Sequence, residues 1–211
     1  MKIPYFIPEI TKKDIKAVSK TLASKWIAPG KEVLKLEKSF SNILSVNHKN
    51  CIAVSSGYSS LHLACHLANI KENDEVLIQT INFVSIANIL KNLKAKIKFI
   101  DCESKSDLNI SIKDLERKVS HKTKALIVMH YGGYPCDMRR ILFLQKKYKF
   151  LLIEDACHAM FSSYGKKKLG SFGNFSSFSF YANKNITCAE GGMLYCKNSQ
   201  HAKRARLLKS H

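Results

Sequence analysis

Lys184 is the residue whose type and position could do covalent chemistry. It follows a short aromatic run, FSFY at residues 178–181, whose alternation with serine predicts a buried strand. A lysine just past a buried strand lies partly out of water. Desolvation disfavours its ammonium form and makes its amine available as a nucleophile. In a chain with so many lysines, the alternative is an ordinary solvated turn lysine.

A second polar cluster follows the apolar run LLI at residues 151–153. Asp155 stands at the end of this predicted strand, and His158 comes three residues later. The carboxyl ends of strands line the ligand crevice in open α/β sheets. A strand-end carboxylate and a lysine able to form a Schiff base together suggest pyridoxal phosphate (PLP), which needs a lysine for its aldehyde and an anion to keep its ring nitrogen protonated. Read alone, Asp155 fits a helix cap equally well, so the interpretation depends on its pairing with Lys184.

A serine-rich loop, SSGYSS at residues 55–60, stands between a predicted strand and a predicted helix. Backbone N–H groups at a helix N-terminus bind phosphate, and a glycine lets the ligand approach closely. The loop is therefore a candidate phosphate site. The alternative, a serine-rich helix cap, stays open on the residues alone.

Several motifs, taken in order, resemble the DegT/StrS family of PLP-dependent sugar aminotransferases. They are VSSGYSSLHLA, QTINFVSIANIL, MHYGGYPCDM, IEDACHA and FSFYANKNITCAEGG, and the resemblance runs from Pro8 to the last residue. It implies the fold of aspartate aminotransferase (fold-type I). The expected fold class is thus the α/β/α large domain of such an enzyme, three layers with a mostly parallel, mixed sheet. PLP is the implied cofactor, and a homodimer is implied for the full-length protein.

The resemblance also implies roles for single residues. Lys184 would hold PLP and shuttle a proton, Asp155 would keep its ring nitrogen protonated, and His158 would lie near its phenolic oxygen. The cofactor-binding residues implied besides these three are Gly57, Tyr58, Ser59, Phe83 and Ser179. Phe83 takes the position that stacks on the cofactor ring, and the others belong to the phosphate site. Tyr58 stands where the family normally carries threonine.

The implied reaction moves an amino group from an amino acid, taken to be glutamate, to a nucleotide-linked keto-sugar. Nucleotide-linked sugars of this kind are used in the biosynthesis of cell-surface polysaccharides or of other sugars. Some relatives replace the lysine with histidine and are dehydratases, so Lys184 favours transamination. Two alternatives stay open. One is an inactive remnant or regulatory relative that keeps the PLP-binding fold, and the other is a basic binding protein without catalysis.

The end of the chain bears on how complete this enzyme is. In the family, the helical stretch at residues 204–211 leads into a small C-terminal domain that closes the site and supplies residues to the partner's cofactor phosphate. We therefore expect that domain to be absent and the chain to be a fragment with little turnover by itself. Residues 1–50 are expected to form an N-terminal helical segment, and residues 51–211 the PLP-binding large domain.

The composition is ordinary except for its charge. The 211 residues are 45% hydrophobic and 24% charged, with a formal net charge of +19. The lysines are dispersed, so we expect no nucleic-acid partner, whereas an anionic substrate would gain from the field. No apolar run reaches the roughly 18 residues of a membrane span, and the N-terminus lacks a signal-peptide core. The seven scattered cysteines fit reduced thiols in a cytoplasmic protein.

Three partial motifs are weaker. His62 and His66 share a helical face but lack the glutamate of HExxH, so we expect no metal site. Residues 165–171 resemble a phosphate-binding P-loop but lack the lysine directly before the serine. No GxGxxG appears, which argues against a dinucleotide-binding dehydrogenase. Residues 132–133 and Asp137 read as a structural turn and a helix cap.

Short apolar strands alternate with helices from residue 51 onward, which predicts a largely parallel sheet covered on both faces. The expected helices span residues 12–24, 33–43, 59–67, 83–93, 112–119 and 138–148. The expected strands span residues 51–54, 75–78, 97–100, 125–129, 150–153, 175–181 and 193–196. Because no helix separates the last two strands, the sheet is expected to be mixed there.

Overall fold

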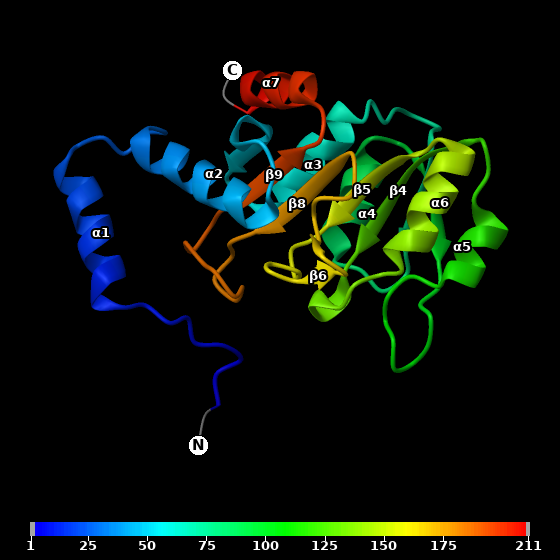
Figure 1. Ribbon diagram of the computed structural model, residues 1–211, viewed down its shortest axis with the longest axis horizontal. Helices are drawn as coiled ribbons and strands as arrows, with labels where there is room; N and C mark the ends of the chain where they lie inside the picture. The colour runs from blue at the N-terminus through cyan, green and yellow to red at the C-terminus, as the bar shows by residue number, and fades with distance from the viewer. Residues whose placement is uncertain (1–2, 210–211) are drawn as a thin grey trace.

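A seven-stranded sheet forms the middle layer of the computed structural model, which describes residues 3–209 (Figure 1). Its strands are β1 (Cys51–Val54), β2 (Glu75–Gln79), β3 (Lys96–Ile100), β4 (Thr123–Met129), β5 (Leu151–Asp155), β8 (Phe175–Ser179) and β9 (Gly192–Cys196). The helices are α1 (Lys12–Ala23), α2 (Lys31–Leu44), α3 (Gly57–Leu67), α4 (Val84–Asn92), α5 (Ile112–Lys118), α6 (Met138–Tyr148) and α7 (Ser199–Leu208). Short 3₁₀ turns lie at His48–Asn50 and Tyr131–Gly133.

The strand order is β1-β9-β8-β5-β4-β2-β3. Neighbouring strands from β3 to β8 are parallel, whereas β9 runs antiparallel to both β8 and β1. The expected mostly parallel sheet is confirmed, and so is its mixed part. A separate small hairpin of β6 (Ser163–Tyr164) and β7 (Lys167–Lys168) was not predicted, because its strands are only two residues long.

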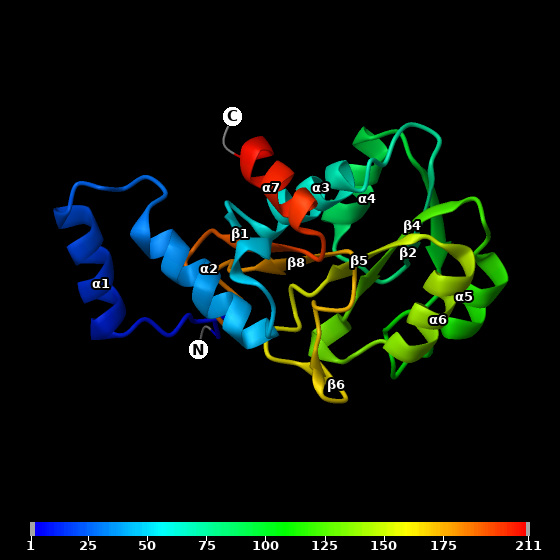
Figure 2. The same ribbon diagram turned by 45° about the horizontal axis from the view of Figure 1, so that its top comes forward.

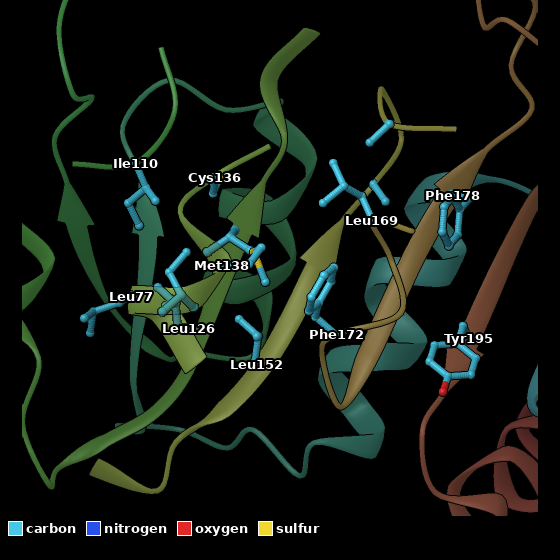
Figure 3. Close-up of a cluster of buried hydrophobic side chains, with 14 of the residues drawn as sticks. Leu77, Ile110, Leu126, Cys136, Met138, Leu152, Leu169, Phe172, Phe178 and Tyr195 are labelled. Atoms are coloured by element: carbon cyan, nitrogen blue, oxygen red, sulfur yellow. The ribbon is translucent and has the colours of Figure 1, made fainter. Parts of the chain in front are cut away.

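Alternate residues of the central strands face two different cores, as the pleat requires. Leu126 of β4 and Leu152 of β5 belong to the core under α2, α5 and α6, which Figure 3 shows in part. Ile127 and Ile153, one residue further along each strand, belong to the core under α3, α4 and α7. The two layers of helices lie on opposite sides of the sheet in Figure 2, which confirms the three-layer α/β/α fold class.

The first helix differs from the others. Every residue of α1 is exposed or half-buried, and α1 extends away from the sheet in Figures 1 and 2. In contrast, α2 packs on the sheet and contributes Phe40 and Leu44 to the core. The division at residue 50 stays a prediction, although α2 shares a core with the sheet strands that follow it.

The predicted elements are all present; α6 and β1 have the predicted bounds, and the ends of the others are shifted by one or two residues. Helix α3 begins two residues before the predicted start, because the Ser56 side chain accepts the N–H of Ser59 and caps it at Gly57. The Asp137 side chain accepts the N–H of Arg140, so the predicted helix cap is confirmed. The predicted helical stretch at residues 204–211 is the end of α7, and residues 210–211 lie outside the described part of the chain.

Candidate functional site

Asp155 is the last residue of β5 and is 2% exposed. Its side chain lies on the α3 and α4 face of the sheet, as does Ile153 two residues before it. The Asp155 carboxylate accepts the N–H of Cys157 at 3.1 Å, and its backbone carbonyl accepts the N–H of His130 at 3.2 Å. A buried carboxylate is thus fixed at the carboxyl edge of the sheet.

His158 lies half-buried just beyond this edge. Burial lowers the pKa of the His158 imidazole, the nearby positive charge of Lys184 lowers it further, and Asp155 opposes the shift. Its ring packs edge-on against Tyr131, with centroids 6.1 Å apart. The structure therefore brings Lys184, Asp155 and His158 within electrostatic reach of one another and favours a neutral imidazole near pH 7.

Lys184 lies in the loop that joins β8 to β9. It is half-buried, as expected for a lysine just past a buried strand, and its N–H donates to the carbonyl of Tyr181 at 2.9 Å. The loop closes on Phe180, whose N–H donates to Gly191 at 2.8 Å and whose carbonyl accepts the N–H of Cys188 at 3.0 Å. These bonds hold the lysine backbone beside the sheet edge and leave its side chain free to reach a ligand.

The N-terminus of α3 approaches β8 closely at Gly57. A Cβ added at Gly57 would lie 2.9 Å from the Ser179 Cβ and 3.1 Å from the Cys157 Sγ, so only glycine fits there. The Ser177 hydroxyl donates to the Gly57 carbonyl at 3.1 Å. Two of the predicted phosphate-binding residues, Gly57 and Ser179, are therefore in contact with each other and next to the segment that follows Asp155.

The remaining phosphate-site residues lie at the same helix end. The Ser59 hydroxyl is 2.8 Å from that of Ser55 and 3.0 Å from that of Ser56, so it is already shared within the loop. Tyr58 is 43% exposed, and its side chain and Ser59 line a cavity of about 610 Å³ between α2, α3 and α7. Lys184, Asp155 and His158 do not line this cavity, which lies to one side of their cluster.

Phe83 precedes α4 at the carboxyl end of β2, on the same edge of the sheet, and is 64% exposed. Its exposed ring is available to stack on a ligand. Next to it, the buried side-chain amide of Asn82 finds no hydrogen-bond partner within residues 3–209, so it could pair with a bound group. The contacts of Phe83 with the other site residues stay a prediction.

These residues fit PLP. A buried carboxylate, a half-buried lysine, an exposed aromatic ring and a helix N-terminus that tolerates only glycine offer what its ring nitrogen, aldehyde, ring face and phosphate require. Among residues 3–209, no group of three or more histidine, cysteine or acidic side chains could hold a metal ion. Within the same part of the chain, every helix is too short or too polar to cross a membrane.

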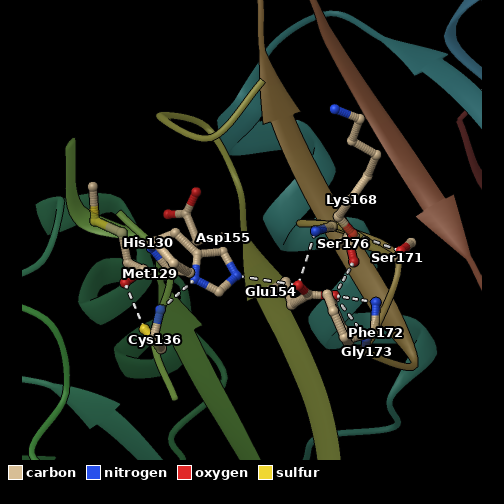
Figure 4. Close-up of polar contacts among 12 residues, drawn as sticks. Met129, His130, Cys136, Glu154, Asp155, Lys168, Ser171, Phe172, Gly173 and Ser176 are labelled. Atoms are coloured by element: carbon tan, nitrogen blue, oxygen red, sulfur yellow. Dashed lines mark hydrogen bonds and ion pairs between the residues drawn. The ribbon is translucent and has the colours of Figure 1, made fainter. Parts of the chain in front are cut away.

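The sequence reasoning missed a buried pair beside the site. Glu154 and His130 are both fully buried, and the His130 Nε2 lies 3.1 Å from the Glu154 carboxylate (Figure 4). A signal for it was present: each residue is charged or polar and stands at the end of an otherwise apolar strand, ALIVMH or LLIED. Buried charges need partners, so two such residues on neighbouring strands predict each other.

The fold is that of the large domain of a fold-type I PLP enzyme. The chain belongs to the DegT/DnrJ/EryC1/StrS aminotransferase family, whose model matches residues 8–211.

Two curated relatives are similar to most of this chain. It is 37% identical over 193 residues to GDP-perosamine synthase of Escherichia coli O157:H7, covering 91% of this chain and 52% of that protein. It is 36% identical over 209 residues to the spore coat polysaccharide biosynthesis protein SpsC of Bacillus subtilis, covering 99% of this chain and 53% of SpsC. The chain thus spans about half the length of these relatives.

Solved structures agree with the fold. The aminotransferase TlmJ from Streptoalloteichus hindustanus superimposes with a TM-score of 0.94 at 31% identity, over 98% of this chain and 56% of TlmJ. Spr1654 from Streptococcus pneumoniae, described as a sugar aminotransferase, superimposes in its PLP form with a TM-score of 0.91 at 26% identity, over 99% of this chain and 58% of Spr1654.

Proposed function

We propose that this chain is the PLP-binding large domain of an aminotransferase that moves an amino group from glutamate to the keto group of a nucleotide-linked sugar. The observation that carries the proposal is the buried Asp155 carboxylate at the carboxyl edge of the sheet, near enough to His158, as Lys184 is, for both charges to act on its imidazole. The similarity to GDP-perosamine synthase supports a nucleotide-linked sugar, and the similarity to SpsC supports a role in polysaccharide biosynthesis.

PLP, when bound, supplies an electron sink for the carbanion left when the amino acid loses its α-proton. Asp155 would hold a proton on the ring nitrogen, since a buried anion favours the charged pyridinium. Lys184 would bind the aldehyde and, once released by the donor amine, carry the proton between the donor's α-carbon and C4′. His158 would donate from its neutral ring to the phenolic oxygen, and Phe83 would cover the ring face.

The phosphate would be bound by the residues that meet where α3 approaches β8. Backbone N–H groups at the α3 N-terminus, around Gly57 and Tyr58, point out of the helix and favour an anion. The Ser179 and Ser59 hydroxyls would add donors. The net charge of +19 would attract a nucleotide sugar as well. We further propose a homodimer for the full-length protein and a cytoplasmic location, which the seven free cysteines fit.

Reductive trapping tests the proposal. The purified chain is mixed with PLP, its visible spectrum is recorded, and borohydride is added before peptide mapping. We expect visible absorbance and a cofactor fixed on Lys184, with both lost in Lys184→Ala. The matched control is Lys167→Ala: burial lowers the pKa of Lys167, so an adduct formed at any reactive amine would appear there and be lost in this variant.

Three outcomes separate the possibilities. A trapped cofactor on Lys184, together with conversion of the spectrum by glutamate, supports an aminotransferase. Trapping without any response to glutamate supports an inactive or regulatory relative. Adducts spread over exposed lysines, with no visible band, would leave a basic binding protein and overturn the proposal.

A further inference from the structure

Glu154 is a buried carboxylate that the proposed chemistry does not use. It precedes Asp155 on β5, and the two side chains point to opposite faces of the sheet because successive strand residues alternate. Asp155 faces the α3 side, where the cofactor would lie. Glu154 faces the opposite core and is fully buried. A lone buried carboxylate is strongly unfavourable, so its partners indicate what it does there.

The Glu154 carboxylate accepts five hydrogen bonds (Figure 4). One oxygen accepts the Gly170 N–H at 2.8 Å and faces the His130 Nε2 at 3.1 Å. The other accepts the N–H groups of Phe172 at 2.8 Å and Gly173 at 2.6 Å, and the Ser176 hydroxyl at 3.2 Å. The donors come from the residue directly after β4, from the loop before β8, and from β8 itself. Glu154 therefore joins three segments at one edge of the sheet.

The hydrogen bonds of His130 fix its tautomer. Its Nδ1 accepts the N–H of Cys136 at 3.3 Å, so the ring proton lies on Nε2 and is donated to Glu154. Burial alone would raise the pKa of Glu154, but this bond and those from the Gly173 and Gly170 N–H groups lower it. Burial lowers the pKa of the His130 imidazole, but its bonds with Cys136 and with the Glu154 carboxylate outweigh this and raise it to about 10. The His130 Nε2–H thus donates to an ionised Glu154 carboxylate.

His130 also contacts Asp155 directly. Its backbone N–H donates to the Asp155 carbonyl at 3.2 Å, while its side chain holds Glu154. Asp155 is the last residue of its strand, where a chain is most free to fray. Two bonds from His130, the residue directly after β4, and four from the β8 side hold that strand end from both flanks.

We propose that Glu154 and His130 are positioning residues that fix the carboxylate of Asp155 in place for the ring nitrogen of the cofactor. The inference deepens the proposed function and rests on it for the role of Asp155. The fixing of Asp155 itself is a property of this chain with or without PLP, so it can be measured on the chain alone.

The test uses two substitutions at one position. In His130→Gln, the amide nitrogen of the longer side chain takes the place of Nε2 and still donates to Glu154. In His130→Asn, the shorter side chain reaches only the place of Nδ1, so the bond to Cys136 can remain while the bond to Glu154 is lost. Both variants shrink the side chain in the same core. A difference between them therefore reports the bond to Glu154 more than the change in packing.

The readout is amide hydrogen exchange at Cys157, followed by NMR without cofactor. The Cys157 N–H donates to the Asp155 carboxylate, so its protection reports whether that carboxylate stays in place. The amides of β3, on the far edge of the sheet, serve as the reference for changes in overall stability. We expect His130→Asn to lower the protection of Cys157 at least tenfold more than it lowers the protection of these amides. In His130→Gln, the protection of Cys157 should stay within about threefold of wild type. If His130→Asn does not fold, Ser176→Ala, which removes one donor to Glu154, should show the same selective loss at a smaller size.

A second readout uses the bound cofactor. With PLP present, His130→Asn should shift the pH at which the visible band changes toward the value found for Asp155→Asn, and His130→Gln should not. Protection at Cys157 that falls no more than at β3, or equally in both His130 variants, would overturn the inference and leave a merely structural pair. Selective loss at Cys157 in a chain that shows no visible band would instead support the positioning and refute the proposed function.

Discussion

Two adjacent carboxylates show how strongly a side chain's role depends on the face that it occupies. Asp155 and Glu154 are neighbours in sequence and both are buried. Asp155 has one backbone N–H donor and its charge acts on His158, whereas Glu154 is saturated by five donors in the opposite core. A carboxylate with few donors is available to a ligand, and a saturated one is not. The proposed role in binding the cofactor and the structural role thus belong to adjacent residues.

At the residue scale, we predict that Asp155→Asn keeps the fold but removes most activity. The amide oxygen can still accept the Cys157 N–H, but a neutral amide cannot stabilise a charged pyridinium. The rate at which glutamate converts the bound cofactor should fall more than tenfold relative to the wild-type chain, about 1.4 kcal/mol. Thermal unfolding of the variant is the control. A smaller loss with an unchanged spectrum would mean that Asp155 does not contact the ring nitrogen.

At the scale of single helices and loops, local interactions affect the free energy of unfolding by amounts that can be measured. Helix α5 is only seven residues long and depends on Asp114 in its first turn. The loop after β8 depends on Ala189, whose φ of +69° lies in the left-handed region. Both give predictions that do not require the function to be known.

Asp114 should make stability depend on pH in the acid range. Burial alone would raise the pKa of its carboxyl, but hydrogen bonds from Lys118, the Asp101 N–H and Arg117 lower it to about 2. The unfolded pKa is higher, so the ionised native state is favoured above about pH 4 and the gain is lost as pH falls toward 2. The expected gain is about 2 kcal/mol.

The measurement compares urea unfolding of wild type and Asp114→Asn. Their difference in free energy of unfolding should be nearly constant above pH 4 and should shrink between pH 4 and pH 2. A difference that does not change over this window would show that the ion pairs of Asp114 contribute nothing.

Ala189→Gly should stabilise the loop that carries Lys184. The left-handed conformation costs a residue with a Cβ about 1–2 kcal/mol, and glycine avoids this cost. Glycine also raises the conformational entropy of the unfolded chain, which offsets part of the stabilisation. The net expectation is a stabilisation of about 0.5 kcal/mol. Ala182→Gly in the same loop is the control, because it has no positive φ to relieve and should destabilise. Chemical denaturation distinguishes the two; stabilisation by both or by neither would refute the strain.

At the scale of the whole molecule, one buried glutamate joins the second helix, α2, to the last helix, α7. Glu37 of α2 is 2% exposed, accepts the N–H of Ala53 at 3.0 Å and pairs with Arg206 of α7 at 2.9 Å. Lys209 lies 3.9 Å away on the same carboxylate. In Figures 1 and 2, α2 and α7 lie on opposite sides of β1, so this pair fastens both to the edge of the sheet.

Glu37→Ala should therefore lower the free energy of unfolding by about 2 kcal/mol, below the usual 3–5 kcal/mol for breaking a buried pair because Arg206 stays partly hydrated. The control is Glu32→Ala in the same helix. Its pair with Lys35 is exposed, and its loss should leave the free energy of unfolding almost unchanged. Urea unfolding checks both. If both substitutions change the free energy of unfolding equally, burial does not make the Glu37 pair more stabilising than an exposed pair.

The sequence by itself determined the fold class, the family and the residues that could do chemistry. Strand and helix periodicity are local properties, so β5, α6 and the mixed part of the sheet were predictable. Lys184 and Asp155 were recognisable because Asp155 ends one strand and Lys184 follows another, and parallel strands have their carboxyl ends at one edge of the sheet. Element ends moved by one or two residues where a cap such as Ser56 decided them.

Only the tertiary structure decided what surrounds those residues. That Gly57 must be glycine follows from the approach of β8, which no local pattern contains. That Glu154 is paired with His130, and that Glu37 binds Arg206, depends on side chains from distant segments meeting in a medium where an unpaired charge is unfavourable. Sequence specifies which groups are present along each element, but desolvation acts only on groups that the fold has brought together.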